Sequence, residues 1–189
     1  MTNHLFDRPW LTKLKKDYHL KNTTRQRIII DTAPLGHEAK KIIFALQRGE
    51  HCSTRLGQLN KIFLGLLKQY GRDRLFREGI FRASLEEYIE AVFLAVVLEN
   101  KKISALPRFD IDVEIYLGAL SDVTGELVRR ATNLIADRKI DEAKKLISAG
   151  QKIVDELLDF DMTGSLRTKY DQARNNLRKL EQLNYEISK

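Results

Sequence analysis

Apolar side chains recur along this chain at steps of three and four residues, the spacing that places them on one face of an α-helix. Ten glycines and three prolines among 189 residues leave little material for turns. The pattern therefore predicts an all-α fold of about six or seven helices. The expected helices cover residues 9–18, 25–48, 53–71, 73–99, 111–138, 139–160 and 166–188, with a kink or break at Pro34 and a loop fixed by Pro107.

The length and hydrophobic content fit one domain. With 43% hydrophobic residues, 189 residues are ample for one core and short for two full-sized domains. We therefore expect a single domain over residues 1–189, in which residues 1–25, polar and basic, form a loosely attached N-terminal arm. The last predicted helix carries a regular apolar stripe from Leu166 to Ile187, which suits either the core or a subunit interface.

Charge and cysteine content narrow the possible functions. Lys and Arg number 33 against 26 Asp and Glu, a net charge of +7, so polyanions are plausible partners. The single cysteine, Cys52, excludes an intrachain disulfide and a cysteine-based zinc site, which fits a reducing cytoplasm. The longest apolar run, Ala91 to Leu98, is too short to span a bilayer. We expect a soluble, cytoplasmic protein without a membrane partner.

Two acids stand out within the predicted helix at 73–99. Glu87 and Glu90 lie one turn apart on a face that also carries Ala91 and Leu94. No lysine or arginine stands three or four positions from either acid. Unpaired acids on an apolar face are costly unless a metal ion or a base from elsewhere compensates them, so this stretch is a candidate site.

A second acidic pair, Asp122 and Glu126, lies on the next long predicted helix. If the two helices pack together, four carboxyl groups face one another, and grouped oxygen ligands suit Mg²⁺ or Mn²⁺. Surface ion pairs of Glu126 with Arg129 and Arg130 are the alternative for that residue. Gly118 and Gly125 interrupt the same helix, which indicates either close helix contact or room for a ligand.

The two acidic motifs resemble a known family. Glu-Tyr-Ile-Glu-Ala-Val (87–92), followed one helix later by Asp-Val-Thr-Gly-Glu-Leu (122–127), is similar to the translin superfamily and specifically to its translin-associated factor X branch. The resemblance implies an antiparallel helical bundle or right-handed superhelix and a metal-dependent endoribonuclease acting on single-stranded RNA. It implies Glu87, Glu90 and Asp122 as catalytic and metal-binding residues, with Glu126 as a fourth ligand. The translin branch lacks the first acidic pair.

Basic residues just before the first acidic pair suit phosphate binding, because a planar guanidinium binds phosphate through two parallel hydrogen bonds. The resemblance places nucleic-acid contacts in this region, although the histidines found there in translin are absent. The expected RNA-binding residues are Arg72, Arg74, Arg77, Arg82 and Arg129.

Two functions of different class follow. The first is an Mg²⁺-dependent endoribonuclease, with Mn²⁺ as an alternative ion, that cleaves single-stranded RNA inside a hollow homo-oligomer. The second is a translin-like oligomer that binds single-stranded RNA or DNA without catalysis and uses the acids as structural hydrogen-bonded groups. The resemblance implies closed octamers, and we expect a homo-octamer because this one chain carries both the acidic motif and the basic residues.

Overall fold

The computed structural model describes residues 5–104 and 112–189, so most of the predicted loop around Pro107 lies outside the described residues. Within these ranges the chain forms seven α-helices and no β-strand, which confirms the all-α prediction. None of these helices has both the length and the apolar character that crossing a bilayer requires. The helices are α1 (Arg8–Gln47), α2 (Ser53–Tyr70), α3 (Arg72–Phe76), α4 (Gly79–Leu98), α5 (Val113–Ala136), α6 (Ile140–Leu158) and α7 (Gly164–Glu186).

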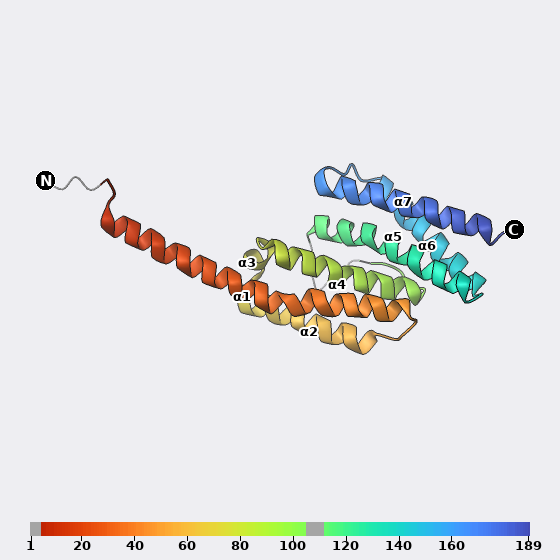
Figure 1. Cartoon of the computed structure of the whole chain (residues 1–189), viewed down its shortest axis with the longest axis horizontal. Helices are drawn as coiled ribbons and strands as arrows, with labels where there is room; N and C mark the ends of the chain where they lie inside the picture. Colours follow the sequence, from red (N-terminus) through yellow and green to blue (C-terminus); the bar gives the residue numbers. More distant parts are fainter. Residues whose placement is uncertain (1–4, 105–111) are drawn as a thin grey trace.

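The helices lie roughly alongside one another, and α4 and α5 occupy the middle of the molecule (Figure 1). α1 packs against α2 and α4, α4 packs against α5, and α5 packs against both α6 and α7. The buried apolar side chains of all seven helices form one continuous cluster. The two acidic motifs therefore lie on neighbouring helices at the centre of the bundle.

Helix α1 is one continuous helix of 40 residues, so a break at Pro34 and the separate short helix at 9–18 are both wrong. The other expectation at Pro34 was a kink, and α1 changes direction where it joins the bundle (Figure 1). Proline removes the hydrogen bond that residue 34 would donate to the carbonyl of Ile30, and its ring crowds that carbonyl, which can bend a helix without ending it. Buried Ile28 and Leu35, on either side of it, hold the helix against the bundle. No residue from Arg8 to Arg27 is buried, and this part of α1 projects away from the other helices (Figure 1).

The helix expected at 73–99 is divided into α3 and α4. The division falls at Glu78, whose backbone is extended (φ −99°, ψ 116°) and whose side chain is buried. Arg74 and Arg25 hold this carboxylate at 2.7 and 3.2 Å. Glycine at position 79 adds little helix propensity, so the chain turns here to satisfy a buried acid.

The apolar stripe of α7 serves mainly the core. Tyr170, Ala173 and Leu180 are buried, and Leu177 is partly buried against the same cluster. Leu180 reaches α6 at Gly150, where a Cβ atom would overlap its Cδ1 atom. The small residue at position 150 thus sets how closely α6 and α7 approach.

We expect Gly150→Ala to destabilise the protein. The added methyl group has to displace a fully buried leucine, which costs about 1–3 kcal/mol and exceeds the gain in helix propensity of about 1 kcal/mol. The matched control is Gly57→Ala in α2, where a Cβ atom meets nothing within 4 Å, and where the same propensity gain should raise stability. Urea denaturation measures both changes, and equal stability of the two variants would contradict this packing.

Candidate functional site

The packing of α4 on α5 brings the two acidic motifs together. Glu90 of α4 makes no hydrogen bond or ion pair with any residue the structure describes. Its burial raises the pKa of its carboxyl group to about 8, and the nearby negative charges of Asp122, Glu87 and Glu126 add to the shift. Glu90 therefore lies close enough to the other three acids of the two motifs for their charges to act on it.

Three of the four acids have partners from distant segments. Lys40 of α1 lies 3.1 Å from Glu87, and Gln47 of α1 donates a hydrogen bond of 2.7 Å to Glu126. Lys169 of α7 forms an ion pair with Asp122. With the side chains so engaged, no group of three or more Asp, Glu, His or Cys residues in the described ranges is arranged to hold a metal ion.

Arg129 and Arg130 do not pair with Glu126, so the alternative of simple surface ion pairs is wrong. Arg130 donates a hydrogen bond of 2.7 Å to the backbone carbonyl of Gln47. The guanidinium of Arg129 lies over the ring of Phe44, 5.0 Å from its centroid. Glu126 is therefore held by the amide of Gln47, which also donates to the carbonyl oxygen of Glu126 at 2.8 Å.

A fifth acid, Glu86, belongs to the cluster and was missed by the sequence analysis. Its Oε1 atom lies 2.5 Å from Nζ of Lys169, so this lysine bridges α4 and α5 through Glu86 and Asp122. Burial raises the pKa of Glu86 despite the opposing effect of Lys169. Burial also works against the charge of Lys169, but its two carboxylate partners outweigh that effect and raise its pKa.

The two glycines of α5 serve close contacts between helices. A Cβ atom at Gly118 would lie 2.9 Å from Cδ of Glu86, so the missing side chain makes room for that carboxylate. A Cβ atom at Gly125 would lie 3.3 Å from the Nδ2 atom of Asn176 in α7. That amide donates a hydrogen bond of 3.0 Å to Thr124. Of the two explanations that the sequence left open, close helix contact is the one observed.

The donor chemistry of the cluster fits a divalent cation. Carboxylate oxygens are the ligands that Mg²⁺ and Mn²⁺ prefer, and Glu90 lies among three further acids without a basic partner in the described chain. The present side-chain arrangement, in which Lys40, Lys169 and Gln47 engage the other three acids, has to open before those acids can act as ligands.

The expected RNA-binding arginines do not form one surface. Arg74 is engaged by buried Glu78, and Arg82 bridges Asp112 and Glu114 at 2.8 Å each. Hydrogen bonding to Asp112 and its negative charge raise the pKa of Arg82, although burial opposes the shift. Arg72 lies over the ring of Phe76, whereas Arg77 and Arg129 are exposed. Arg129, one turn beyond Glu126, stands next to the acidic cluster.

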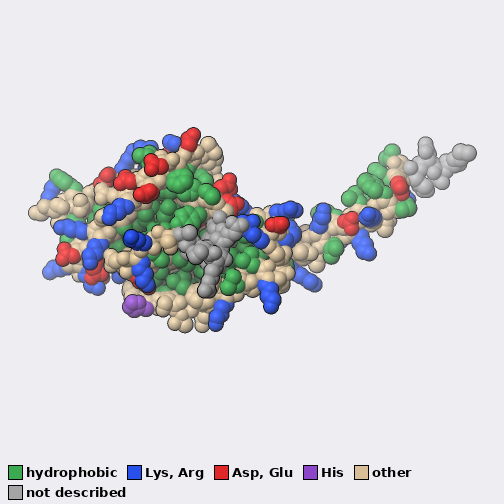
Figure 2. Space-filling model, turned by 180° about the vertical axis from the view of Figure 1, so that it is seen from behind, with side chains coloured by type: hydrophobic (Ala, Val, Ile, Leu, Met, Phe, Trp, Pro, Cys, Tyr) green, Lys and Arg blue, Asp and Glu red, His purple; other side chains and the backbone are tan. Residues whose placement is uncertain are grey.

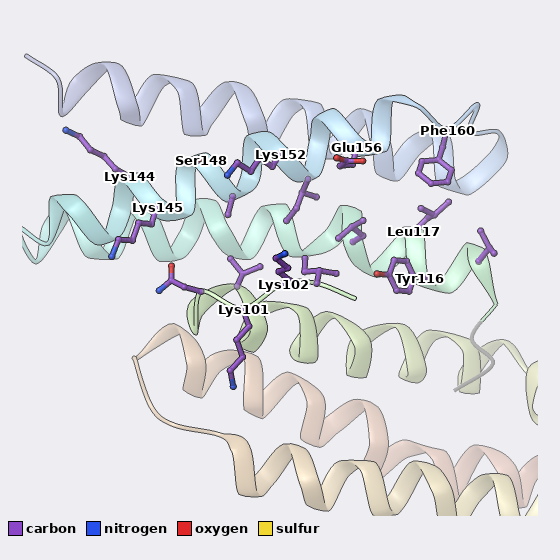
Figure 3. Close-up of a pocket in the computed structure, with 17 residues that line it drawn as sticks. Lys101, Lys102, Tyr116, Leu117, Lys144, Lys145, Ser148, Lys152, Glu156 and Phe160 are labelled. Atoms are coloured by element: carbon purple, nitrogen blue, oxygen red, sulfur yellow. The ribbon is translucent and has the colours of Figure 1, made fainter. Parts of the chain in front are cut away.

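A separate pocket of about 1270 Å³ lies between the end of α4, α5 and α6 (Figure 3). Its walls include apolar Leu117, Tyr116 and Phe160. Lysines surround them, namely Lys101, Lys102, Lys144, Lys145 and Lys152. The pocket shares no residue with the acidic cluster, because Tyr116 and Leu117 point to a different side of α5 from Asp122.

The comparisons with known proteins agree with this architecture. A model of the Translin family matches residues 23–188 of the chain. This protein therefore belongs to the translin family. An uncharacterized protein of Methanocaldococcus jannaschii, MJ0175, is 24% identical over 165 residues, which cover 84% of this chain and 74% of that protein.

Solved structures share the fold. The crystal structure of apo-NeC3PO has a TM-score of 0.77 at 22% identity and covers 94% of this chain and 97% of its own. The structure of AfC3PO has a TM-score of 0.78 at 18% identity, covering 94% and 96% of the two chains. AfC3PO in complex with duplex RNA gives 0.75 at 16% identity, covering 95% of both. At these identities the likeness establishes the fold.

Sequence reasoning identified the acids but not the groups that neutralise them. Lys40, Gln47 and Lys169 lie at least 47 positions from their partners, so no local spacing points to them. Glu86 adjoins Glu87, and the glycine at position 118 was the one sequence signal that a neighbouring helix carries a group needing space.

We expect the stability of the protein to depend on pH through Glu90. Its pKa is about 8 in the folded chain and ordinarily 4.5, so between these values the folded state holds a proton that the unfolded state releases. Stability must then fall as pH rises from about 5 to about 8. Glu90→Gln, which mimics the protonated acid, should remove this fall and be more stable than wild type at pH 8.

Melting temperatures of wild type and Glu90→Gln across pH 5–8 measure this effect, with about 2–4 °C expected for each kcal/mol of difference. Glu181→Gln, at an exposed position of α7, is the control and should show a constant difference from wild type. If wild type and Glu90→Gln also differ by a constant amount, Glu90 does not hold a proton in the folded protein.

Proposed function

We propose that this chain is a metal-dependent endoribonuclease of the translin-associated factor X type that cleaves single-stranded RNA within a homo-oligomer. The observation that carries the proposal is Glu90. It lies in the partly buried cluster with Glu87, Asp122 and Glu126, and no basic residue of the described chain pairs with it. An acid placed in this way costs stability, and a divalent cation is the species that would compensate it.

Each acid has a role in this proposal. Glu87, Glu90 and Asp122 hold Mg²⁺ or Mn²⁺, and Glu126, oriented by Gln47, completes the set. The bound ion would lower the pKa of a water molecule and neutralise charge on the phosphate. Arg129, exposed beside Phe44 and one turn from Glu126, would contact the phosphate backbone of a strand entering the cluster.

Binding to nucleic acid is supported independently of catalysis. The chain carries a net charge of +7, and a structure of AfC3PO, which shares this fold, is a complex with duplex RNA. Lys and Arg side chains lie along the projecting part of α1 and across the face of the molecule seen in Figure 2. We propose RNA as the partner, with unpaired strands preferred because a site enclosed by subunits admits a flexible strand more readily than a rigid duplex.

The alternative is a translin-like binding oligomer without catalysis. The ion pairs of Lys40 with Glu87 and of Lys169 with Asp122 favour it, because they satisfy the acids without a metal ion. The unpaired Glu90 opposes it, since a purely structural cluster gains nothing from a fourth, raised-pKa carboxyl group. Dependence of RNA cleavage on added divalent metal separates the two functions.

We propose a closed homo-oligomer, an octamer in its complete form. The stripe on α7 is used in the core, but the projecting part of α1 exposes large apolar side chains. Trp10, Leu14 and Tyr18 are 54%, 48% and 66% exposed and recur every four residues along one side of the helix. Most of the stability of a helix in a protein comes from packing of its apolar face, so packing of this part of α1 against another subunit would stabilise it.

We expect Glu90→Ala and Asp122→Ala each to abolish RNA cleavage while leaving RNA binding largely intact. Removing a metal ligand disables activation of water but leaves the phosphate contacts in place. Labelled single-stranded RNA incubated with Mg²⁺, with Mn²⁺ and with chelator measures cleavage, and filter binding in chelator measures affinity.

One control variant and one RNA-binding variant complete this test. Glu181→Ala, in an exposed part of α7, should cleave like wild type, whereas Arg129→Ala should weaken RNA binding and flatten its salt dependence. Wild-type protein that binds RNA and never cleaves it with either metal would establish the binding oligomer instead.

We expect the double variant Leu14→Glu and Tyr18→Glu to reduce the mass of the assembly. Two charges on the apolar side of the projecting helix cannot be buried in an interface. The control variant, Thr12→Glu with Thr23→Glu, adds the same two charges at exposed positions on the opposite side of the same helix. Light scattering should give several times 21.9 kDa for wild type and for the control. A wild-type monomer that cleaves RNA at full rate would refute the enclosed site.

A further inference from the structure

Lys169 occupies a specific place in the acidic cluster. It extends from α7 to the junction of α4 and α5, where its ammonium group contacts Oε1 of Glu86 at 2.5 Å and the carboxylate of Asp122. Its side chain is 31% exposed, whereas that of Lys40, the other lysine paired with the cluster, is 60% exposed. Lys169 is thus the inner of the two cations that neutralise these acids.

The fold is shaped to keep Glu86 beside this lysine. Gly118 is the residue of α5 that faces the Glu86 carboxylate, and a side chain there would push that carboxylate out of its present position beside Lys169. On α4, Glu86 lies about 100° from Glu87 and one turn before Glu90, and it is Glu86 whose carboxylate contacts Lys169. Glu86 is therefore a second carboxylate for Lys169, separate from the acids that our proposed function assigns to the metal ion.

Asp122 is shared between two demands. While its carboxylate is paired with Lys169, a divalent cation bound by Asp122 would stand next to a positive charge. Like charges a few ångströms apart repel strongly in a partly buried site. Lys169 must move away from Asp122 for the metal ion to bind, and Glu86 remains as its partner when it does.

We propose that Lys169 is an internal counter-cation that competes with the divalent metal ion for Asp122, and that Glu86 is the carboxylate that holds Lys169 when the metal ion binds. Lys169 stabilises the cluster without metal and lowers its metal affinity, and Glu86 limits that competition. Both are positioning residues, and the inference rests on the proposed metal-binding function.

The test is Mn²⁺ binding to the purified full-length protein, measured by isothermal titration calorimetry and by the loss of the free Mn²⁺ signal in electron paramagnetic resonance. Lys169→Met, which keeps an unbranched apolar side chain and removes the charge, should bind Mn²⁺ at least about tenfold more tightly than wild type. It should also melt at a lower temperature than wild type in chelator and regain stability with Mn²⁺. Lys179→Met, an exposed position on the same helix, is the control and should match wild type.

Glu86→Gln provides a second change with the opposite sign. Without the Glu86 carboxylate, Lys169 has only Asp122 as a charged partner on α4 and α5, so Mn²⁺ affinity should fall several-fold. In the double variant the effect of Glu86→Gln should disappear, because no lysine remains to be held. General damage to the site would lower affinity in every variant and could not produce this reversal.

Unchanged or weaker Mn²⁺ binding by folded Lys169→Met, with binding and cleavage intact in wild type, would overturn this inference and leave the proposed nuclease standing. A Glu86→Gln effect that persists in the double variant would overturn the role of Glu86 and make it a ligand. If neither wild type nor Lys169→Met binds Mn²⁺, both the competition and the metal-dependent nuclease are refuted.

Discussion

The central constraint on this structure is the repulsion among carboxylates that α4 and α5 bring together inside the bundle. Burial of Glu90, together with the nearby charges of Asp122, Glu87 and Glu126, raises the pKa of its carboxyl group to about 8. Side chains from the neighbouring helices reduce that repulsion by pairing with three of the acids. α1 supplies Lys40 and Gln47, and α7 supplies Lys169. Residues of four helices therefore contribute to the charge balance of this cluster.

The fold was largely predictable because helix periodicity is a local property. The helix boundaries that were predicted wrongly are those that depend on packing between helices. Pro34 does not interrupt α1, since buried residues on both sides hold the helix against α4. The break between α3 and α4 depends on Glu78, whose partner Arg25 lies on a different helix. The spacing of residues within one helix predicts neither the packing that keeps α1 continuous at Pro34 nor the ion pair of the buried Glu78 with Arg25.

In the candidate site, too, the residues that share one helix were predictable from the sequence, and those from distant helices were not. Glu87 with Glu90 and Asp122 with Glu126 were identified from their spacing within single helices. Lys169 was not, because it acts from a helix whose placement depends on the whole fold. Gly118 is the informative exception, since a glycine inside a helix costs stability and its reason, the Glu86 carboxylate, lies on the neighbouring helix.

The continuous helix α1 connects the projecting N-terminal part of the chain to the acidic cluster. At 1.5 Å per residue its 40 residues span about 60 Å, and the same rod carries the projecting apolar side chains at one end and Lys40 and Gln47 at the other. Pro34 lies between the two parts, at the point where a helix bends most easily. The exposed apolar side chains that would contact another subunit and the two residues that contact the acids therefore belong to the same helix, on opposite sides of Pro34.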